Sequence, residues 1–499
     1  MNAAQVVAGL GWSAGATLVN AVGQFVFLAV LARLLEPANF GLLAMAGIAL
    51  RFGSFFAQLG FAQALIQKTE LRPADHTAAL VMALALGCTF YAVTALAAPA
   101  FATYFRAPEL LAVLVVLAAS LPLAAVGGLP MAVLRRAGRF KRIAIIEVLS
   151  FVVGYGAVGT ACASSGLGVW SLVAAALAQH AITLVLGFAC ARYTLAWPLQ
   201  RASFHHLGRF GATYSLIGFV EFLSANVESL FLGRAFGAAS LGMFNRAVAL
   251  VHLPVEQAVT AVNKVLFPAL ASMQSDRSRL ADGFEMLLLG VGLFSTALAC
   301  GIAAAAPDVV ALLLGPKWLE AAPLVVIVAF AAPPMFMYVA CGITLDSMGA
   351  LRPKLKLQLV TLVAKVALVV GLAQVAGMPG VALAVVAAEA LRLAMGLRVV
   401  SRRLALGPWR CSQLMAVFLI EGAVVFGAVH LAAAGANEAG WALPWRVAFE
   451  ALAGLCVVCV GALVLLMRYP AYAPLQRFDT VRRWHGRALQ WLPQRWSHS

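Results

Sequence analysis

Charged side chains are scarce in this chain of 499 residues. Asp, Glu, Lys and Arg make up 11% of the sequence, whereas hydrophobic residues make up 63%. A soluble globular domain carries about 25% charged residues, and a folded surface needs polar groups to cover it. The composition therefore excludes a soluble enzyme, a disordered protein and a secreted disulfide scaffold. Since one bilayer span takes about 20 apolar residues, the chain can supply on the order of a dozen or more membrane helices.

Motifs of known catalytic chemistry are also missing. The sequence contains no DxD pair, HExxH, GxSxG or phosphate-binding loop, and its eight cysteines lie in or beside apolar runs. Cys456 and Cys459 form a CxxC pair, which on a hydrophobic helix indicates small apolar residues rather than a redox or zinc site. Residues 1–9 carry no basic side chain, so we expect no cleaved signal peptide. We predict neither a cofactor nor a metal site.

Apolar runs, separated by charges, proline and glycine, predict an all-α polytopic membrane protein of about fourteen transmembrane helices. The seventh and eighth ranges are the most charged and the least typical of a membrane span. The predicted helices cover residues 11–32, 40–64, 78–98, 110–134, 143–162, 168–190, 211–232, 241–266, 285–306, 323–345, 357–376, 380–400, 412–433 and 447–467.

Basic residues outnumber acidic ones by 35 to 19, which gives a net charge of +16. In a soluble protein this excess indicates nucleic-acid binding. Here the cations gather in alternate loops: with a cytoplasmic N-terminus, 25 of the 35 lie in inner loops and the tail, and five lie in outer loops. The positive-inside rule therefore predicts that both termini are cytoplasmic, and we expect no nucleic-acid partner.

The two halves of the sequence repeat each other. Equivalent residues occur in the same order, at an offset that grows slowly from 201 to 212 residues. The matched pairs are Arg33 and Arg234, Gly41 and Gly242, Pro99 and Pro307, Pro108 and Pro316, Gly138 and Gly349, and Gly168 and Gly380. Because each copy holds six helices, an even number, the copies enter the membrane from the same side. This predicts two parallel six-helix lobes around a central cavity, with alternating access by rocking of the lobes.

The repeat also predicts the domain organisation. The N-terminal lobe covers 1–195 and the C-terminal lobe covers 196–405. Two additional transmembrane helices lie in 406–467, outside the duplication. A basic cytoplasmic tail, 468–499, carries three Trp among its Arg residues, which allows either an amphipathic helix on anionic lipid or a frayed end.

Ionisable residues inside a span are costly and mark candidate functional positions. Arg51 lies within the second predicted helix, and its counterpart at an offset of 201 is His252 in the eighth. If the first two helices of each lobe line the cavity, these cations face an anionic cargo, since guanidinium pairs with phosphate through a planar fork. The candidate substrate-binding residues are Arg51, Arg246, Lys264, Arg33, His252, Asn20 and Gln24.

Several of these cations have a simpler interpretation. Arg33 and Arg234 lie at outer helix ends and Arg246 and Lys264 lie near the ends of their helix, so each side chain can instead reach the membrane interface.

The acidic residues also leave two interpretations open. Glu221 and Glu228 are seven residues apart and share a helix face, so they either neutralise Arg246 or bind a coupling cation. With Glu256, they are the candidate ion-coupling residues. Glu389 and Arg392 have the i, i+3 spacing of a local ion pair, and we expect Lys365 to have a partner on another helix.

At several segments the sequence resembles a known family. These are ARLLEPANFGLLAMA (32–46), GFAQALIQK (60–68), LRRAGRFKRIAIIEV (134–148), GVWSLV (168–173), GRAFGAASLGMFNRA (233–247), LFPALASMQSD (266–276) and LGPKWLEAAPLVVI (314–327). They look like the polysaccharide-transport (Wzx-type) flippases of the multidrug/oligosaccharidyl-lipid/polysaccharide exporter superfamily. The resemblance covers about residues 10–400 and says little about the last two helices.

The resemblance implies a flippase of the bacterial inner membrane. Its cargo would be undecaprenyl-diphosphate-linked oligosaccharide for exopolysaccharide, capsule or lipopolysaccharide biosynthesis, with membrane lipids, a polysaccharide polymerase and a co-polymerase as further partners. It also implies cationic cavity residues near the diphosphate, which fits Arg51 and Arg246.

Three other functions remain as alternatives. A cation-coupled multidrug exporter of the same superfamily typically carries an acidic residue on the first helix, and this chain has none there. A polysaccharide polymerase or ligase typically carries a long outer loop with reactive polar groups. The longest outer loop predicted here is only 307–322, which counts against this alternative. A scaffold for a synthesis complex is compatible with the basic tail.

Overall fold

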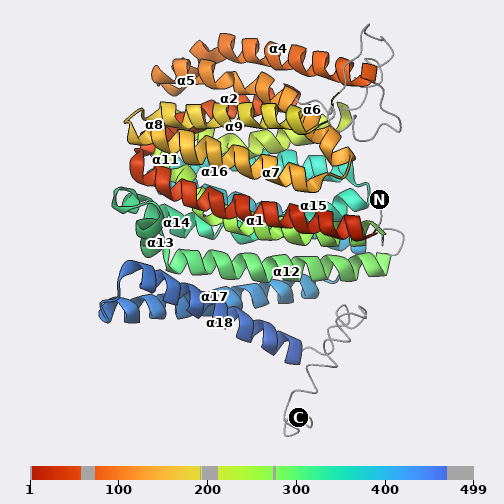
Figure 1. The fold of residues 1–499 in the computed structure, drawn as a ribbon. Helices are drawn as coiled ribbons and strands as arrows, with labels where there is room; N and C mark the ends of the chain where they lie inside the picture. The colour runs from red at the N-terminus through yellow and green to blue at the C-terminus, as the bar shows by residue number, and fades with distance from the viewer. Residues whose placement is uncertain (1–2, 58–72, 192, 194–211, 273–276, 469–499) are drawn as a thin grey trace. The chain divides into compact units, whose positions relative to one another are not determined.

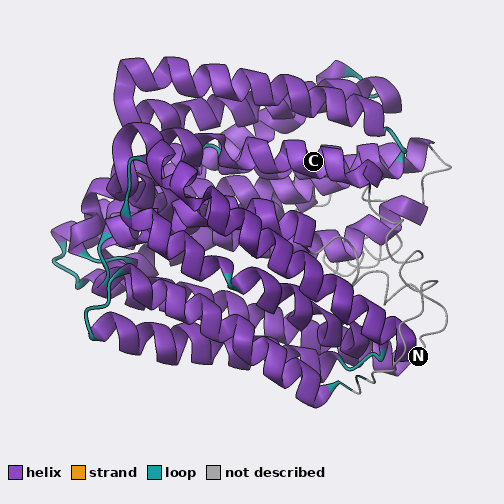
Figure 2. Ribbon diagram, turned by 90° about the horizontal axis from the view of Figure 1, so that it is seen from above, coloured by secondary structure: helices purple, strands orange, loops and turns teal. Residues whose placement is uncertain are grey.

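The computed structural model describes residues 3–57, 73–191, 193, 212–272 and 277–468, and every regular element within these ranges is a helix (Figures 1 and 2). In hydrocarbon the backbone finds no water, so each N–H and C=O needs a partner in its own segment, and the α-helix supplies it. The all-α prediction is confirmed for this part of the chain.

The first half of the described chain forms short and long apolar helices in succession. They are α1 (Ala3–Leu34), α2 (Pro37–Ala57), α4 (Pro73–Phe105), α5 (Glu109–Ala118), α6 (Ser120–Arg136), α7 (Phe140–Phe151), the π-helix η1 (Val152–Gly159), α8 (Thr160–Ser164) and α9 (Val169–Cys190).

The second half contains the two longest elements, α11 and α16. Its elements are α11 (Ala212–Ser272), α12 (Arg277–Ala304), α13 (Ala306–Leu313), the 3-10 helix η2 (Pro316–Ala321), α14 (Ala322–Ala329), α15 (Ala332–Ser347), α16 (Leu351–Leu404), α17 (Pro408–Glu438) and α18 (Leu443–Arg468).

Each predicted span overlaps a helical segment, but the number of spans differs. Nine helices of the described residues are long and apolar enough to cross a bilayer, or ten if the pair Pro316–Ala329 and Ala332–Ser347, bent by 40°, forms one span. α11 and α16 each count once, although each is broken at a glycine with non-helical backbone, Gly237 and Gly377. The two most charged predicted spans lie on either side of Gly237. The count of about fourteen stays a prediction.

Packing density divides the chain into two compact units, and neither is continuous in sequence. Unit 1 comprises Met1–Arg246, Leu313–Ala321 and Ala373–Val381. Unit 2 comprises Ala247–Leu312, Ala322–Leu372 and Ala382–Ser499. The lobe boundaries predicted at 195 and 405 stay predictions.

The helix ends reproduce the internal repeat. Gly138 and Gly349 both have left-handed backbone, with φ of 67° and 63°. Each ends its helix with the same kind of hydrogen bond: Arg139 N donates to Leu134 O at 3.0 Å, and Ala350 N donates to Leu345 O at 2.8 Å. Only glycine adopts this conformation at little cost, which explains why both copies carry it.

The same repeat places a break inside one helix of each copy. α5 and α6 meet at Ala119, and α14 and α15 are separated at Phe330 and Ala331. Both breaks fall inside a continuous apolar run, so the sequence predicts one straight helix where the structure has two.

The outward side chains of the helices are apolar, as a bilayer requires. Leu96 on α4 is 82% exposed and Leu419 on α17 is 74% exposed. In unit 2, α17 and α18 lie side by side and both pack on α12 (Figure 1). These surfaces would not be stable in water, and they support a multi-pass membrane protein.

Candidate functional site

The site in unit 1 is positioned by two glycine contacts between α2 and the first part of α11. A methyl group added to Gly41 would overlap the carbonyl oxygen of Ala238, and one added to Gly242 would overlap that of Pro37. Pro37 and Ala238 are 201 residues apart, as are Gly41 and Gly242. The repeated motif therefore builds a reciprocal contact, in which each copy's glycine meets the backbone of the other copy's turn.

Arg246 lies one turn beyond this contact on α11. Its guanidinium carbon is 4.6 Å from the centre of the Phe40 ring, and Tyr155 is close enough to interact with its charge. The Nε atom is buried and has no hydrogen-bond partner among the described residues. The Phe40 ring thus stabilises this cation through a cation–π contact, and no carboxylate of the described residues accepts a hydrogen bond from its Nε atom.

Arg234, the repeat counterpart of Arg33, is held similarly. Its guanidinium lies 5.8 Å from the centre of the Tyr104 ring, and its Nη1 atom is buried without a hydrogen-bond partner in the described part of the chain. Arg33 itself is exposed, and its methylene stem runs beside Gly315.

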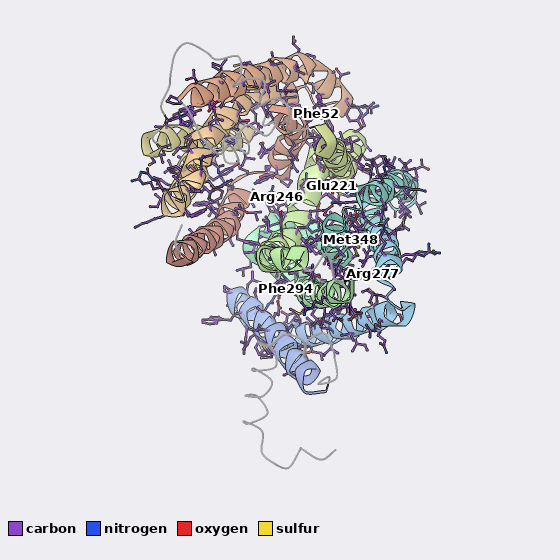
Figure 3. The ribbon with its side chains drawn as sticks, turned by 90° about the vertical axis from the view of Figure 1, so that its right-hand side faces the viewer. Phe52, Glu221, Arg246, Arg277, Phe294 and Met348 are labelled. Atoms are coloured by element: carbon purple, nitrogen blue, oxygen red, sulfur yellow. The ribbon has the colours of Figure 1, made fainter. Side chains whose placement is uncertain are left out.

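Arg51 on α2 and Glu221 on α11 each precede a phenylalanine in the sequence, and these two phenylalanines are in contact. The residues that follow them, Phe52 and Phe222, have ring centres 6.1 Å apart, and Figure 3 labels Phe52 and Glu221 at this place. Both charged side chains are exposed, whereas Glu228, two turns further along α11, is half-buried. The structure therefore brings a predicted substrate ligand and a predicted ion-coupling residue to the same pair of helices.

The polar residues of α1 are less exposed. Asn20 and Gln24 are both half-buried, and Asn20 Oδ1 has no hydrogen-bond partner among the described residues. Their spacing of four places them on one face of α1.

The remaining candidates belong to the later part of α11, in unit 2. His252 is half-buried against Phe336, with ring centres 5.9 Å apart, and Glu256 is exposed. The side chain of Lys264 lies outside the described residues.

A segment from the second copy packs on α1 within unit 1. Trp318, on η2, is fully buried, and its Nε1–H donates to Ala32 O at 2.9 Å. Lys317 pairs with Glu36 at 3.3 Å, and the Trp318 ring lies 5.5 Å from that of Phe40. Phe40 therefore connects this segment to Arg246. The sequence shows LGPKW as a motif but does not show which helix it contacts.

The predicted ion pair of α16 is present in unit 2. Arg392 Nη2 lies 2.6 Å from Glu389 Oε2, and Lys365 Nζ lies 4.0 Å from Glu389 Oε1. Lys365 and Glu389 are buried and lie on the two parts of α16, on either side of the break at Gly377.

Sequence reasoning missed two ion pairs of unit 2. Arg410 pairs with the buried Glu285 at 3.4 Å, and Arg446 pairs with Asp308. Both arginines lie outside the predicted spans, where a charged side chain has an ordinary explanation. The signal that could have found the second pair is Glu450, a carboxylate four residues after Arg446 and inside a predicted span.

Metal ligation has no candidate in the residues that the structure describes, since no three His, Cys, Asp or Glu side chains gather there. Cys456 and Cys459 are both free and exposed. Within unit 1, the guanidinium groups of Arg234 and Arg246 are partly buried and pack against aromatic rings.

Comparison with known proteins identifies relatives in polysaccharide biosynthesis. A family model described as "Polysaccharide biosynthesis protein" matches residues 30–323. The lipopolysaccharide biosynthesis protein WzxC of Escherichia coli (strain K12) is 25% identical over 320 residues, which are 63% of this chain and 64% of WzxC. The succinoglycan biosynthesis transport protein ExoT of Rhizobium meliloti (strain 1021) is 26% identical over 337 residues, 66% of each chain. The chain thus spans slightly less than two thirds of these relatives.

Solved structures with the same fold are membrane transporters. The lipid II flippase MurJ in an inward closed conformation matches with a TM-score of 0.73 at 12% identity, over 91% of this chain and 99% of that one. An inward-facing multidrug resistance MATE family transporter of the MOP superfamily matches with a TM-score of 0.57 at 17% identity, over 78% of this chain and 94% of that one. At these identities the likeness establishes the fold alone.

Proposed function

The chain belongs to the polysaccharide biosynthesis protein family, and we propose that it is a flippase for undecaprenyl-diphosphate-linked oligosaccharide in the bacterial inner membrane. It would serve exopolysaccharide, capsule or lipopolysaccharide assembly. Both termini would lie on the cytoplasmic side, because 25 of the 35 basic residues then fall in inner loops and the tail. A polymerase and a co-polymerase would receive the translocated units.

Arg246 is the observation that carries this proposal. The guanidinium packs on Phe40, and its buried Nε atom has no hydrogen-bond partner among the described residues, so this donor remains for a ligand. Isolated charge inside a membrane is costly, so such a group favours an anion. Two phosphates in series offer the oxygens that a guanidinium fork recognises best.

The proposed cycle divides the cargo between two environments. The diphosphate binds Arg51 and Arg246, with Arg33, Lys264, His252, Asn20 and Gln24 completing the polar lining. The sugars follow through the central cavity as the lobes rock, and the isoprenoid tail stays in lipid. Charged and polar groups cannot cross hydrocarbon uncovered, whereas the tail gains nothing by leaving it.

An ion gradient would drive the return of the empty carrier. Glu221, Glu228 and Glu256 are the acidic residues of α11 that would bind the coupling cation. Glu221 precedes Phe222, whose ring contacts that of Phe52 next to Arg51, so ion and cargo would act on the same pair of helices.

The alternative of a cation-coupled drug exporter fits this chain less well. Helix α1 carries no acidic side chain along Ala3–Leu34, and its charge near the end is Arg33. A site for cationic drugs needs negative charge, which α1 does not supply along Ala3–Leu34.

The test starts from cells that lack the protein. Lipid-linked intermediates are extracted, assigned to a membrane face and identified by their glycan. Accumulation on the cytoplasmic face supports the proposal and names the cargo. Normal intermediates and export, together with new sensitivity to cationic drugs, would establish the drug exporter instead.

Complementation then tests the cation. Arg51→Ala should reduce polymer export about 10- to 100-fold at unchanged protein level, since a hydrogen-bonded charge contributes about 1.5–3 kcal/mol. Arg51→Lys should restore part of the export. Arg398→Ala, which removes an exposed arginine of α16, is the matched control and should export normally. A fully active Arg51→Ala variant would refute the assignment of Arg51.

A further inference from the structure

Four polar side chains meet where α13, α17 and α18 pack together in unit 2. Arg446 of α18 donates from Nε to Asp308 Oδ2 at 3.0 Å, and its Nη2 pairs with Asp308 Oδ1. Its Nη1 donates to Asn437 Oδ1, at the end of α17, at 2.7 Å. Three of the five N–H donors of the guanidinium therefore bind α13 and α17, and the two on Asp308 have the bidentate geometry that makes such pairs strong.

Glu450, one turn after Arg446, is the member of this group without a donor. It is 1% exposed, and neither of its carboxylate oxygens has a hydrogen-bond partner among the described residues. The groups that act on it are Asp308 and Arg446, and the Asp308 carboxyl lies within hydrogen-bonding reach. Two ionised carboxylates cannot hydrogen-bond to each other, because both are acceptors.

The surroundings offer no other counter-charge among the described residues. The residues packed around this end of the helices form an apolar cluster, to which α12 contributes Ala297, Cys300 and Ala304 and α17 contributes Val425 and Val429. Gly454, one turn after Glu450, lies against Val429. On α17, Glu438 and His430 are exposed. One cation and two carboxylates leave a net charge of −1 in this apolar environment, which is costly.

We propose that Asp308 and Glu450 share one exchangeable proton, which makes this junction a protonatable site that fastens the α17–α18 pair to α13. The proton supplies the missing donor between the two carboxyl groups and brings the charge of the cluster to zero. Loss of the proton leaves two carboxylates in contact and weakens the junction. With the termini placed as proposed above, this end faces the outer side, so the site would respond to the pH outside the membrane.

The junction connects to the rest of the chain through α13. This helix ends at Leu313, and the chain continues directly into Gly315 and η2, where Trp318 is buried against α1 of unit 1. A change in the protonation of Asp308 therefore acts on α13, which precedes the packed segment at Trp318 by a few residues. This gives α17 and α18, the two helices outside the repeat, a role that depends on protonation. The role does not depend on which glycan is carried.

Infrared spectroscopy of the full chain in lipid bilayers tests the shared proton. The wild type should show the carbonyl stretch of a protonated carboxyl group at neutral pH, and this band should disappear from the spectrum of Glu450→Gln. Glu438→Gln, which changes an exposed carboxylate at the end of α17, should keep the band. A difference spectrum between wild type and Glu450→Gln that lacks the band would overturn the proposal.

Thermal unfolding gives a second readout that a merely structural role would not change. The amide introduced by Glu450→Gln can donate to Asp308, so this variant should unfold at the wild-type temperature at neutral pH. The unfolded chain loses this proton at the ordinary pKa of a glutamate, about 4.3, and the folded wild type loses it at a higher pH; between these two values the folded state binds one more proton than the unfolded chain. Through that window the unfolding constant of the wild type should rise by up to tenfold per pH unit, and that of the variant should not.

A second variant and a comparison of salts distinguish a shared proton from a bound sodium ion. Asp308→Asn should also remove the infrared band, because the Glu450 carboxylate then balances the charge of Arg446 and the cluster is neutral without a proton. If added sodium chloride, compared with choline chloride, protects wild type but not Glu450→Gln from unfolding and the band is absent in both, the site binds sodium and the shared proton is refuted.

Discussion

Adding one methyl group at Gly41 should separate the two copies of the repeated motif. Within a helix, Gly→Ala ordinarily stabilises by about 1 kcal/mol, because alanine loses less backbone freedom on folding. At Gly41 the new methyl group would overlap the carbonyl oxygen of Ala238, which is backbone and cannot rotate away. Overpacking of this kind costs about 1–3 kcal/mol, and we take the upper end because a helix must move. We therefore expect Gly41→Ala to be destabilised by about 2 kcal/mol.

Gly47 supplies the matched control on the same helix. A methyl group there meets only the Arg51 guanidinium, at 4.0 Å, which is ordinary contact with the end of a flexible side chain. Gly47→Ala should keep the full gain of about 1 kcal/mol, so the two variants should differ by about 3 kcal/mol. The assay is the thermal unfolding temperature of each purified variant in the same detergent.

The reciprocal glycine sharpens this test. Gly242→Ala should be destabilised to a similar extent, since its methyl group would overlap Pro37 O. The double variant should lose less than the sum of the two, because one separation of α2 from α11 relieves both overlaps. A Gly41→Ala variant as stable as Gly47→Ala would refute the close contact and the reasoning built on it.

Two further substitutions test single contacts of unit 1. Trp318→Phe should lower the unfolding temperature by an amount equivalent to about 1 kcal/mol, because it removes the hydrogen bond to Ala32 O but keeps the ring buried; an unchanged temperature would contradict that bond. Arg106→Gly should raise the unfolding temperature by an amount equivalent to about 1–2 kcal/mol, since Arg106 has a left-handed backbone (φ 54°) that glycine adopts at little cost; a lower temperature would show that the arginine side chain contributes more than the strain costs.

Hydropathy and charge predict where the helices lie because the bilayer imposes one simple rule on every span. They predict less well how a helix is interrupted. The break at Ala119 is followed by Pro122 and the break at Phe330 by Pro333, in the first turn of the next helix, and a proline at that position is a weak signal inside an apolar run. The π-helical stretch Val152–Gly159 contains no proline or charge, so the one-dimensional pattern gives no sign of it.

The sequence predicts the charged residues of the candidate site but not the contacts around them. Arg51, Arg246 and the glutamates of α11 stand out in sequence because ionisable groups are rare in apolar runs. That Arg246 packs on Phe40, and that Phe40 contacts Trp318 from the other copy, depends on contacts between segments more than two hundred residues apart. The Asp308–Arg446 pair was missed because both residues lie at helix ends, where a charge usually faces water.

The discontinuity of unit 1 determines the order in which it can be completed during synthesis. Ala32 and Trp318 are 286 residues apart in the chain, and unit 1 also includes Ala373–Val381. At about 5–20 residues per second, the ribosome needs roughly 15 s to 1 min to reach Trp318 after Ala32 has emerged. During that interval the first helices are already in the membrane, while the segment that covers the end of α1 has not been made. The nascent protein must therefore keep a binding surface for its own later segments open, and any factor that assists insertion has this interval in which to occupy it.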